Sequence, residues 1–183
     1  MISEEMFFDT DCISSFLWVK RGDIIINLFN GKIILPKPVY DELKNPHIPH
    51  IGREVDNMYG NNLLEVVDIE VGSEEYNIYH ELAIAPPKER IPIGKGEAAA
   101  IALAKVNGGV VASNNLRDIM YYVKKYDLKY VTTGDILARA LYNGEITEDE
   151  GNCIWRKMLS KKRKLPTTTF TEFINQYVQA IEK

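Results

Sequence analysis

Cysteine, histidine and long apolar runs are scarce in this sequence, and each shortage excludes a class of protein. The two cysteines, Cys12 and Cys153, lie far apart, and they form no array of zinc-site spacing with the three histidines. A disulfide framework is therefore excluded as the basis of the fold, and we expect both thiols to stay reduced. No apolar stretch is long enough to predict a transmembrane helix.

The N-terminus lacks the features of an export signal. The opening residues, MISEEMFFDTD, reach acidic side chains before any extended apolar run and have no basic start. Together with the lack of a transmembrane segment, this predicts a cytoplasmic protein that has no membrane partner.

A surplus of basic charge is also missing. The chain carries 22 Lys and Arg against 26 Asp and Glu, a formal net charge of -4. Proteins that hold nucleic acid mainly by bulk electrostatic attraction usually carry a basic surplus, so any such contact must be local here. The one dense basic run contains Arg156, Lys157, Lys161, Lys162, Arg163 and Lys164. This run is either a solvated surface or a contact for RNA phosphates or an acidic partner.

What the sequence does contain is an alternation of strand and helix patterns. Its 183 residues, 45% of them hydrophobic, are enough for one domain with a sizeable core. The segments that predict strands are MFFD, KIILP, LLEVVDIEV, GVVAS and the start of LKYVTTG. Because helical segments separate them, we expect an α/β fold with a central parallel sheet of about four or five strands flanked by helices.

The sequence after Gly134 has a helical pattern throughout. The helical segments are DILARALYNG, TEDEGNCIWRKMLSKKRK and TFTEFINQYVQAIEK, with breaks at Gly144 and Pro166. We therefore expect a single domain over residues 1–183, with a core at about residues 6–140 and a helical extension at about residues 141–183.

Carboxylates stand where predicted strands end and helices begin. Asp9 and Asp11 follow the first strand, and Asp118 follows GVVAS, so these acids converge if the two strands are neighbours. Each acid also has an ordinary explanation when it is taken alone. Asp9 and Asp11 could cap a helix, Glu97 and Asp118 could favour the positive end of one, and Glu42 could be a solvated surface residue.

A cluster of these acids would need electrostatic compensation. Two carboxylates about 4 Å apart repel by roughly 4 kcal/mol at an effective dielectric constant of about 20. Protonation, basic partners or a metal ion can offset this repulsion. Carboxylate oxygens suit Mg²⁺ or Mn²⁺, and either ion can activate water for hydrolysis of a phosphodiester without a nucleophilic side chain.

Four short motifs resemble, in order and spacing, those of the PIN-domain nucleases. The first is MFFDTDCISSFL, a hydrophobic strand that ends in an aspartate. The second is PVYDEL, which supplies a glutamate, and the third is GEAAAIALA, in which an acidic residue opens an alanine-rich helix. The fourth is VVASNNLRDI, a strand followed by a serine, asparagines and an aspartate. The resemblance covers about residues 6–140.

The resemblance implies a metal-dependent endonuclease with an acidic quartet. The catalytic residues would be Asp9, Glu42, Glu97 and Asp118, supported by Asp11, Ser113, Asn114 and Asn115. Asp9, Glu97 and Asp118 would bind Mg²⁺ or Mn²⁺ directly, while Glu42 would hold a metal through water or position the attacking water. In one branch of the family two aspartates replace the asparagine pair, and by that alignment Asn114 takes the fourth acidic position instead of Asp118.

The family also implies an RNA substrate, the toxin role of a toxin–antitoxin pair with a cognate antitoxin protein, and a homodimer. Two other functions stay open. The asparagine pair is compatible with a PIN-like protein that keeps the fold but acts as an RNA-binding or protein-binding regulatory module. The same carboxylates could also hydrolyse DNA.

Overall fold

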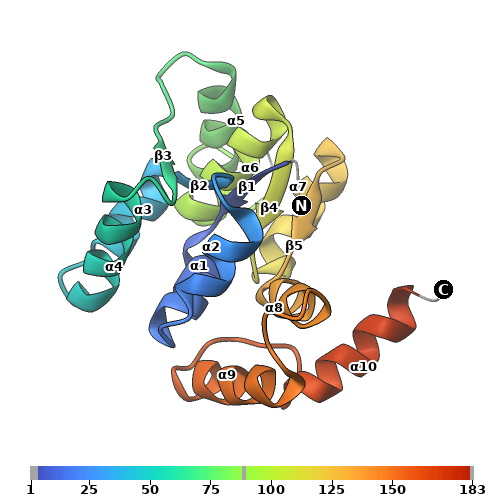
Figure 1. The fold of residues 1–183 in the computed structure, drawn as a ribbon. Coiled ribbons are helices and arrows are strands. Elements are labelled where there is room, and N and C mark those ends of the chain that lie inside the picture. The colour runs from blue at the N-terminus through green and yellow to red at the C-terminus, as the bar shows by residue number, and fades with distance from the viewer. Residues whose placement is uncertain (1–3, 88–89, 182–183) are drawn as a thin grey trace.

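A sheet of five parallel strands forms the centre of the computed structural model, which describes residues 4–87 and 90–181 (Figure 1). The elements in chain order are β1 (Glu5–Phe8), α1 (Thr10–Trp18), α2 (Gly22–Phe29), β2 (Ile33–Pro36), α3 (Lys37–Leu43), α4 (Pro49–Gly60), β3 (Glu65–Val67), α5 (Glu74–Ala83), α6 (Lys95–Asn107), β4 (Gly109–Ala112), α7 (Leu116–Tyr126), β5 (Lys129–Val131), α8 (Thr133–Tyr142), α9 (Glu148–Ser160) and α10 (Phe170–Ile181). The predicted α/β class and parallel sheet are confirmed.

The strand order, β3-β2-β1-β4-β5, places a crevice at one particular point of the sheet. Every neighbouring pair of strands is parallel. The chain begins in the central strand β1, adds β2 and β3 on one side, and then crosses to add β4 and β5 on the other. The order therefore reverses between β1 and β4. Open α/β sheets form their ligand-binding crevice at such a point, beyond the carboxyl ends of the strands.

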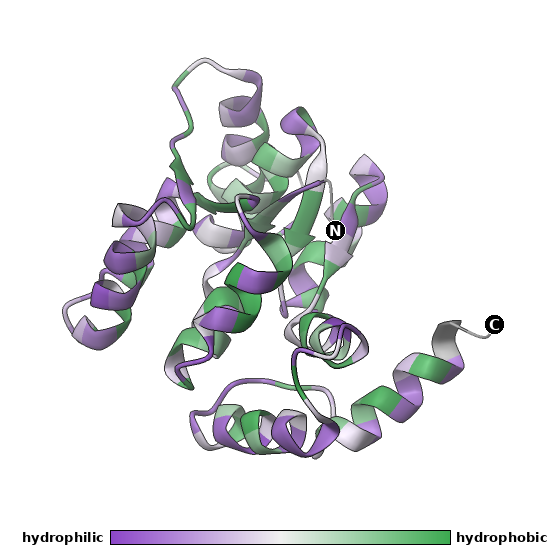
Figure 2. Ribbon diagram, viewed as in Figure 1, coloured by the Kyte–Doolittle hydropathy of each residue, from purple (hydrophilic) through white to green (hydrophobic). Residues whose placement is uncertain are grey.

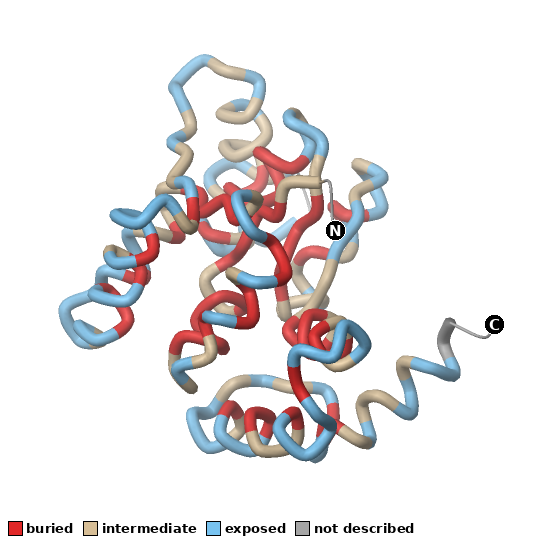
Figure 3. Tube along the Cα trace, viewed as in Figure 1, coloured by how far each residue is buried: buried red, intermediate tan, exposed pale blue. Residues whose placement is uncertain are grey.

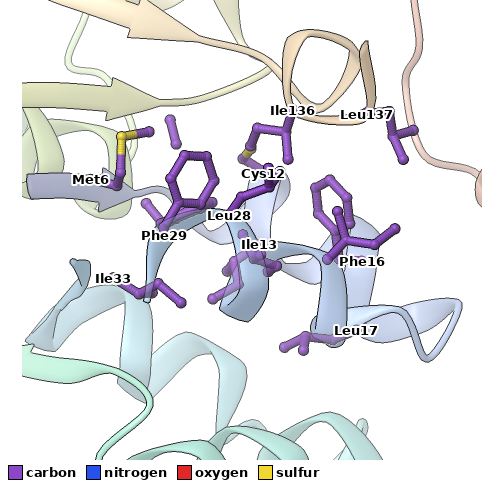
Figure 4. Close-up of a cluster of buried hydrophobic side chains, with 14 of the residues drawn as sticks. Met6, Cys12, Ile13, Phe16, Leu17, Leu28, Phe29, Ile33, Ile136 and Leu137 are labelled. Atoms are coloured by element: carbon purple, nitrogen blue, oxygen red, sulfur yellow. The ribbon is translucent and has the colours of Figure 1, made fainter. Parts of the chain in front are cut away.

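Alternate residues of the central strands supply two separate cores. Met6 and Phe8 point to the face covered by α1, α2 and α8, whereas Phe7 points to the face covered by α5, α6 and α7. Figure 4 shows part of the first core. In this core Phe29 packs edge to face on Phe8, with 6.0 Å between the ring centroids. The strands β2, β1 and β4 are largely hydrophobic and buried, whereas the edge strands β3 and β5 are partly exposed (Figures 2 and 3). Burial on both faces fixes β1 and β4 in place beneath the crevice.

Helices α9 and α10 pack on each other through Trp155. Its ring centroid lies 5.7 Å from that of Phe170 and 5.4 Å from that of Phe173, and its Nε1 donates a hydrogen bond of 3.0 Å to the carbonyl of Thr167. Gly151 permits this close approach, because a Cβ added there would lie 2.3 Å from Cδ1 of Phe170. Since α9 also contacts α1 and α8, the segment that follows it returns towards the carboxyl edge of the sheet.

The helix predicted over residues 147–164 is wrong at its end. It stops at Ser160, and Lys162 takes a left-handed conformation with φ 59°. Lysine rarely adopts this conformation, so the sequence carries no signal for the stop. The strand predicted in LLEVVDIEV is shorter than expected, and the end of the last predicted helix, at residues 182–183, lies outside the described residues. Across residues 4–87 and 90–181, no helix is both long and apolar enough to cross a membrane.

Candidate active site

Asp9 lies at the end of β1, inside the crevice, and its carboxylate is almost completely buried. Its side chain caps α1, since Oδ1 accepts a hydrogen bond of 2.7 Å from the amide of Cys12. Oδ2 is buried without a hydrogen-bond partner. The pKa of Asp9 is raised from 3.8 to about 7, first by burial and then by the negative charges of Glu97 and Asp11, against the opposing effects of Ser113 and the Cys12 amide. Asp9 is therefore both a helix cap and a buried acid with one oxygen, Oδ2, left without a partner among the described residues.

Asn115 connects two of the other predicted acids. Its Nδ2 donates to Oε1 of Glu97 at 3.1 Å and to Oδ2 of Asp118 at 2.7 Å. The backbone amide of Asn115 donates to Oγ of Ser113 at 3.2 Å, which fixes the turn between β4 and α7. Glu97 opens α6 and Asp118 lies in the first turn of α7. One amide group thus holds the acids from two helix starts beside the carboxyl end of β4.

Asn114 faces a different neighbour from Asn115. Its Nδ2 donates to Oγ1 of Thr133 at 2.9 Å, and its Oδ1 accepts from the Thr133 amide at 2.9 Å. A longer contact of 3.4 Å joins Nδ2 to Oδ2 of Asp11. Asn114 therefore connects the loop after β4 to the start of α8. Its amide group both donates to and accepts from Thr133, which a carboxylate could not do.

Glu42 lies at the margin of the site. It is exposed on α3, and the hydroxyl of Thr10 donates a hydrogen bond to its Oε2. A Cβ added to Gly96 would lie 3.0 Å from Oγ1 of Thr10 and 3.6 Å from Oε2 of Glu42, so the start of α6 passes close to both. The structure thus brings Glu42 to the start of α6, and within the described residues its side-chain hydrogen bond is to Thr10 and not to Asn115.

A pocket of about 250 Å³ lies between the acids and the chain that follows α9. The residues that line it are Asp11, Glu97, Asn114, Asn115, Lys162, Arg163 and Lys164. Nη1 of Arg163 lies 3.4 Å from Oδ1 of Asp11, which forms an ion pair across 152 residues of chain. A hydrogen bond from Arg117, at 3.0 Å, is the largest influence lowering the pKa of Asp118, and Asn115 and the charge of Lys164 add to it. Basic side chains thus compensate part of the acidic cluster.

The predicted basic run is divided by the structure. Lys162, Arg163 and Lys164 line the pocket, whereas Arg156 and Lys157 are exposed on α9, away from it. Lys161 lies beside the indole of Trp18, with Nζ 5.8 Å from the ring centroid.

Thr10 and Arg117 contact the acids but were not predicted to belong to the site. Thr10 stands between Asp9 and Asp11 in the first turn of α1, and its bond to Glu42 joins residues that are 32 apart in the sequence. Arg117 is next to Asp118 in the sequence and forms an ion pair with it, so its contact was easier to predict than that of Thr10.

The oxygen donors fit a magnesium or manganese ion. In residues 4–87 and 90–181, no three Asp, Glu, His or Cys side chains gather in a group that could hold a metal ion. Mg²⁺ does not need such a group, because it is usually bound by one or two carboxylates and keeps several waters. Asp9 and Glu97 are close enough for the charge of Glu97 to raise the pKa of Asp9. Oδ2 of Asp9 has no hydrogen-bond partner in the described part of the chain, so it is available as a ligand for such an ion.

Comparison with known proteins identifies the family. No curated protein matches the chain significantly in sequence. The family model described as a PIN domain matches residues 5–179, which include all five strands and every acid described above. The protein therefore belongs to the PIN-domain family, whose members are typically nucleases.

Proposed function

We propose that this protein is a metal-dependent endoribonuclease that hydrolyses RNA phosphodiester bonds at the acidic crevice. The observation that carries the proposal is the carboxylate of Asp9, which is buried at the point where the strand order reverses and has an unpartnered Oδ2 beside Glu97. Burying such a group without a partner is unfavourable, so the fold retains it against stability. A requirement for a cation at this point explains the arrangement.

The residues of the site have distinct roles in this proposal. Asp9 and Glu97 would hold Mg²⁺ or Mn²⁺, with Asp118 reaching the ion through bound water; the ion would lower the pKa of bound water and neutralise charge that develops on the phosphate. Asn115 orients the carboxylates of Glu97 and Asp118 through its two hydrogen bonds. Glu42, oriented by the Thr10 hydroxyl, would position the attacking water.

Cleavage assays with matched RNA and DNA strands test the proposal. Purified protein should cut the RNA in Mg²⁺ or Mn²⁺ and leave it intact in EDTA. Cleavage of DNA alone would establish the DNA-processing alternative. Binding of RNA without cleavage in either metal would establish the regulatory module instead, and the proposed activity would be rejected.

Gly94→Ala tests the position of Glu97 without altering the acid itself. A Cβ at residue 94 would lie 2.0 Å from Oε2 of Glu97, while the backbone angles, φ -58° and ψ 148°, are open to alanine. We expect the carboxylate to move away from Asn115, which should slow RNA cleavage by about 10–100-fold. The free energy of unfolding should change by no more than about 0.5 kcal/mol, because a flexible side chain can yield.

Gly60→Ala is the matched control, since nothing lies within 4 Å of a Cβ at that position. Denaturant unfolding and initial cleavage rates would be measured for both variants. Equal cleavage by Gly94→Ala, Gly60→Ala and wild type would show that the observed position of Glu97 does not matter for the reaction.

The biological setting we propose is that of a cytoplasmic toxin which acts as a homodimer and is neutralised by a cognate antitoxin protein. Support comes from membership of the PIN-domain family and from the resemblance of the four motifs. Growth arrest on expression, relieved by co-expression of the product of a neighbouring gene, would support this setting. Expression without any effect on growth or on cellular RNA would count against it.

A further inference from the structure

The chain that follows α9 is built as one wall of the acidic pocket. The amide of Lys162 donates to the carbonyl of Leu159 at 2.9 Å, and that of Arg163 donates to the carbonyl of Met158 at 3.1 Å. These two bonds form a Schellman turn, in which the left-handed position usually belongs to glycine. Here Lys162 occupies that position with φ 59°. A lysine there is less favourable than glycine by about 1–2 kcal/mol, and Lys20 takes the same position after α1 with φ 56°.

Arg163 attaches this wall to the opposite side of the pocket. Its Nη1 lies 3.4 Å from both Oδ1 of Asp11 and Oγ of Ser14, and its guanidinium carbon lies 6.0 Å from the ring centroid of Trp18. The side chain of Arg163 is only 24% exposed. These contacts, all to α1, hold the backbone on either side of Arg163 above the acids.

The two lysines beside Arg163 have no such attachment. Lys162 and Lys164 are exposed, both line the pocket, and within the described residues neither forms an ion pair or a side-chain hydrogen bond. The charge of Lys164 contributes to the lowered pKa of Asp118, which the pocket residue Asn115 contacts. Lys162, Arg163 and Lys164 therefore form a basic wall of the pocket. Arg163 is bound to α1, and the lysine on either side of it is not bound to another side chain of the described residues.

We infer that Lys162 and Lys164 bind backbone phosphates of a single RNA strand next to the phosphodiester that enters the acidic pocket, with Arg163 as the positioning residue. This inference rests on the proposed function. A polyanion must approach carboxylates in a protein whose net charge is -4, so local cations are needed to hold it. The two free ammonium groups supply them at the rim, and a lysine in the left-handed position places one of them there.

The test is the salt dependence of RNA binding, measured in EDTA so that no cleavage occurs. The probe is a fluorescently labelled twelve-nucleotide oligouridylate, and its anisotropy is followed between about 25 and 200 mM KCl. Each phosphate contact to a single strand contributes about 0.7 to the slope of log K against log salt. The variant Lys162→Gly/Lys164→Ala should therefore lower the magnitude of this slope by about 1.4 and weaken binding at least about tenfold at the lowest salt.

Arg156→Ala/Lys157→Ala is the matched control, because it removes the same charge from the same basic run outside the pocket. Its slope should remain close to that of wild type. Lys162→Gly places glycine at a position with positive φ, where glycine is favoured over lysine. The thermal midpoint of the pocket variant should therefore equal or exceed that of wild type. A loss of binding can then be told apart from a loss of folding.

Three results would overturn the inference. They are equal slopes for wild type and the pocket variant, an equal decrease in the control, and no binding of oligouridylate by wild type. The first two can occur while wild type still cleaves RNA with Mg²⁺, which leaves the proposed function intact. Conversely, lysine-dependent binding without any cleavage supports the phosphate site and rejects the nuclease.

Discussion

Asp9→Asn should stabilise the metal-free protein at pH 8, by up to about 4 kcal/mol in the free energy of unfolding. The pKa of Asp9 is raised from 3.8 to about 7, chiefly by burial, so ionising it in the folded protein is unfavourable. Asparagine removes that charge and is as good a helix cap as aspartate, so the bond to the Cys12 amide is kept. Denaturant unfolding in EDTA measures the difference.

The pH dependence of this effect has a definite sign. Below about pH 4 the carboxyl of Asp9 is protonated in both folded and unfolded chains, so it does not affect stability. As the pH rises from about 4 to 7, the unfolded chain releases the proton first and the wild type loses stability. Above about pH 7 the full penalty is present. The profile of Asp9→Asn should therefore be flatter than that of wild type over this range.

Asp118→Asn is the chemically matched control. The pKa of Asp118 is lowered, first by the hydrogen bond from Arg117, so its charge is favourable in the folded protein. Removing it should leave stability at pH 8 unchanged or slightly reduced, the opposite sign from Asp9. Two results would contradict this prediction: destabilisation by Asp9→Asn at pH 8, or parallel pH profiles for wild type and Asp9→Asn. Either would show that the buried charge of Asp9 does not lower the stability of the wild type.

Loss of the central acids should reduce RNA cleavage far more than loss of Glu42. We expect Asp9→Asn and Glu97→Gln to lower the rate by about 10³-fold, because each removes a charge that the proposed metal site requires. Glu42→Gln should lower it by only about tenfold, since Glu42 is exposed and its contact is with Thr10. Initial rates with saturating Mg²⁺ give the comparison.

Circular dichroism and unfolding would establish that all three variants fold. If Glu42→Gln lowered the cleavage rate as much as Asp9→Asn, Glu42 on α3 would be as important for the reaction as Asp9. Full activity in Glu97→Gln would remove α6 from the catalytic site.

The centre of the sheet was predictable because β1, β2 and β4 are buried on both faces and carry continuous apolar patterns. MFFD, KIILP and GVVAS coincide closely with β1, β2 and β4, and helices between them require parallel pairing. The edge strand β3 was predicted too long. It covers only Glu65–Val67, and the apolar residues that follow do not form a further strand pair. Sheet pairing, which is non-local, decides where such a strand ends.

The site was predictable only in part, for a related reason. Asp9 could be placed from its position at a strand end, and the pairing of β1 with β4 brings its amide to the carbonyl of Ala112 and its side chain to Ser113. The position of Arg163 could not be predicted, because it depends on a turn with lysine where glycine is usual and on an ion pair to Asp11 across 152 residues. Local patterns contain neither the turn nor the contact.

Binding of Mn²⁺ at pH 8, followed by electron paramagnetic resonance, tests most directly whether the acidic crevice holds a metal. Titration of wild type should reduce the signal of free Mn²⁺ through a site that involves Asp9 and Glu97. Asp9→Asn should weaken this binding by at least about tenfold, since altering even residues that support a metal's ligands lowers affinity by about 10–100-fold. Equal affinity in wild type and Asp9→Asn would contradict the assignment of the crevice as the metal site.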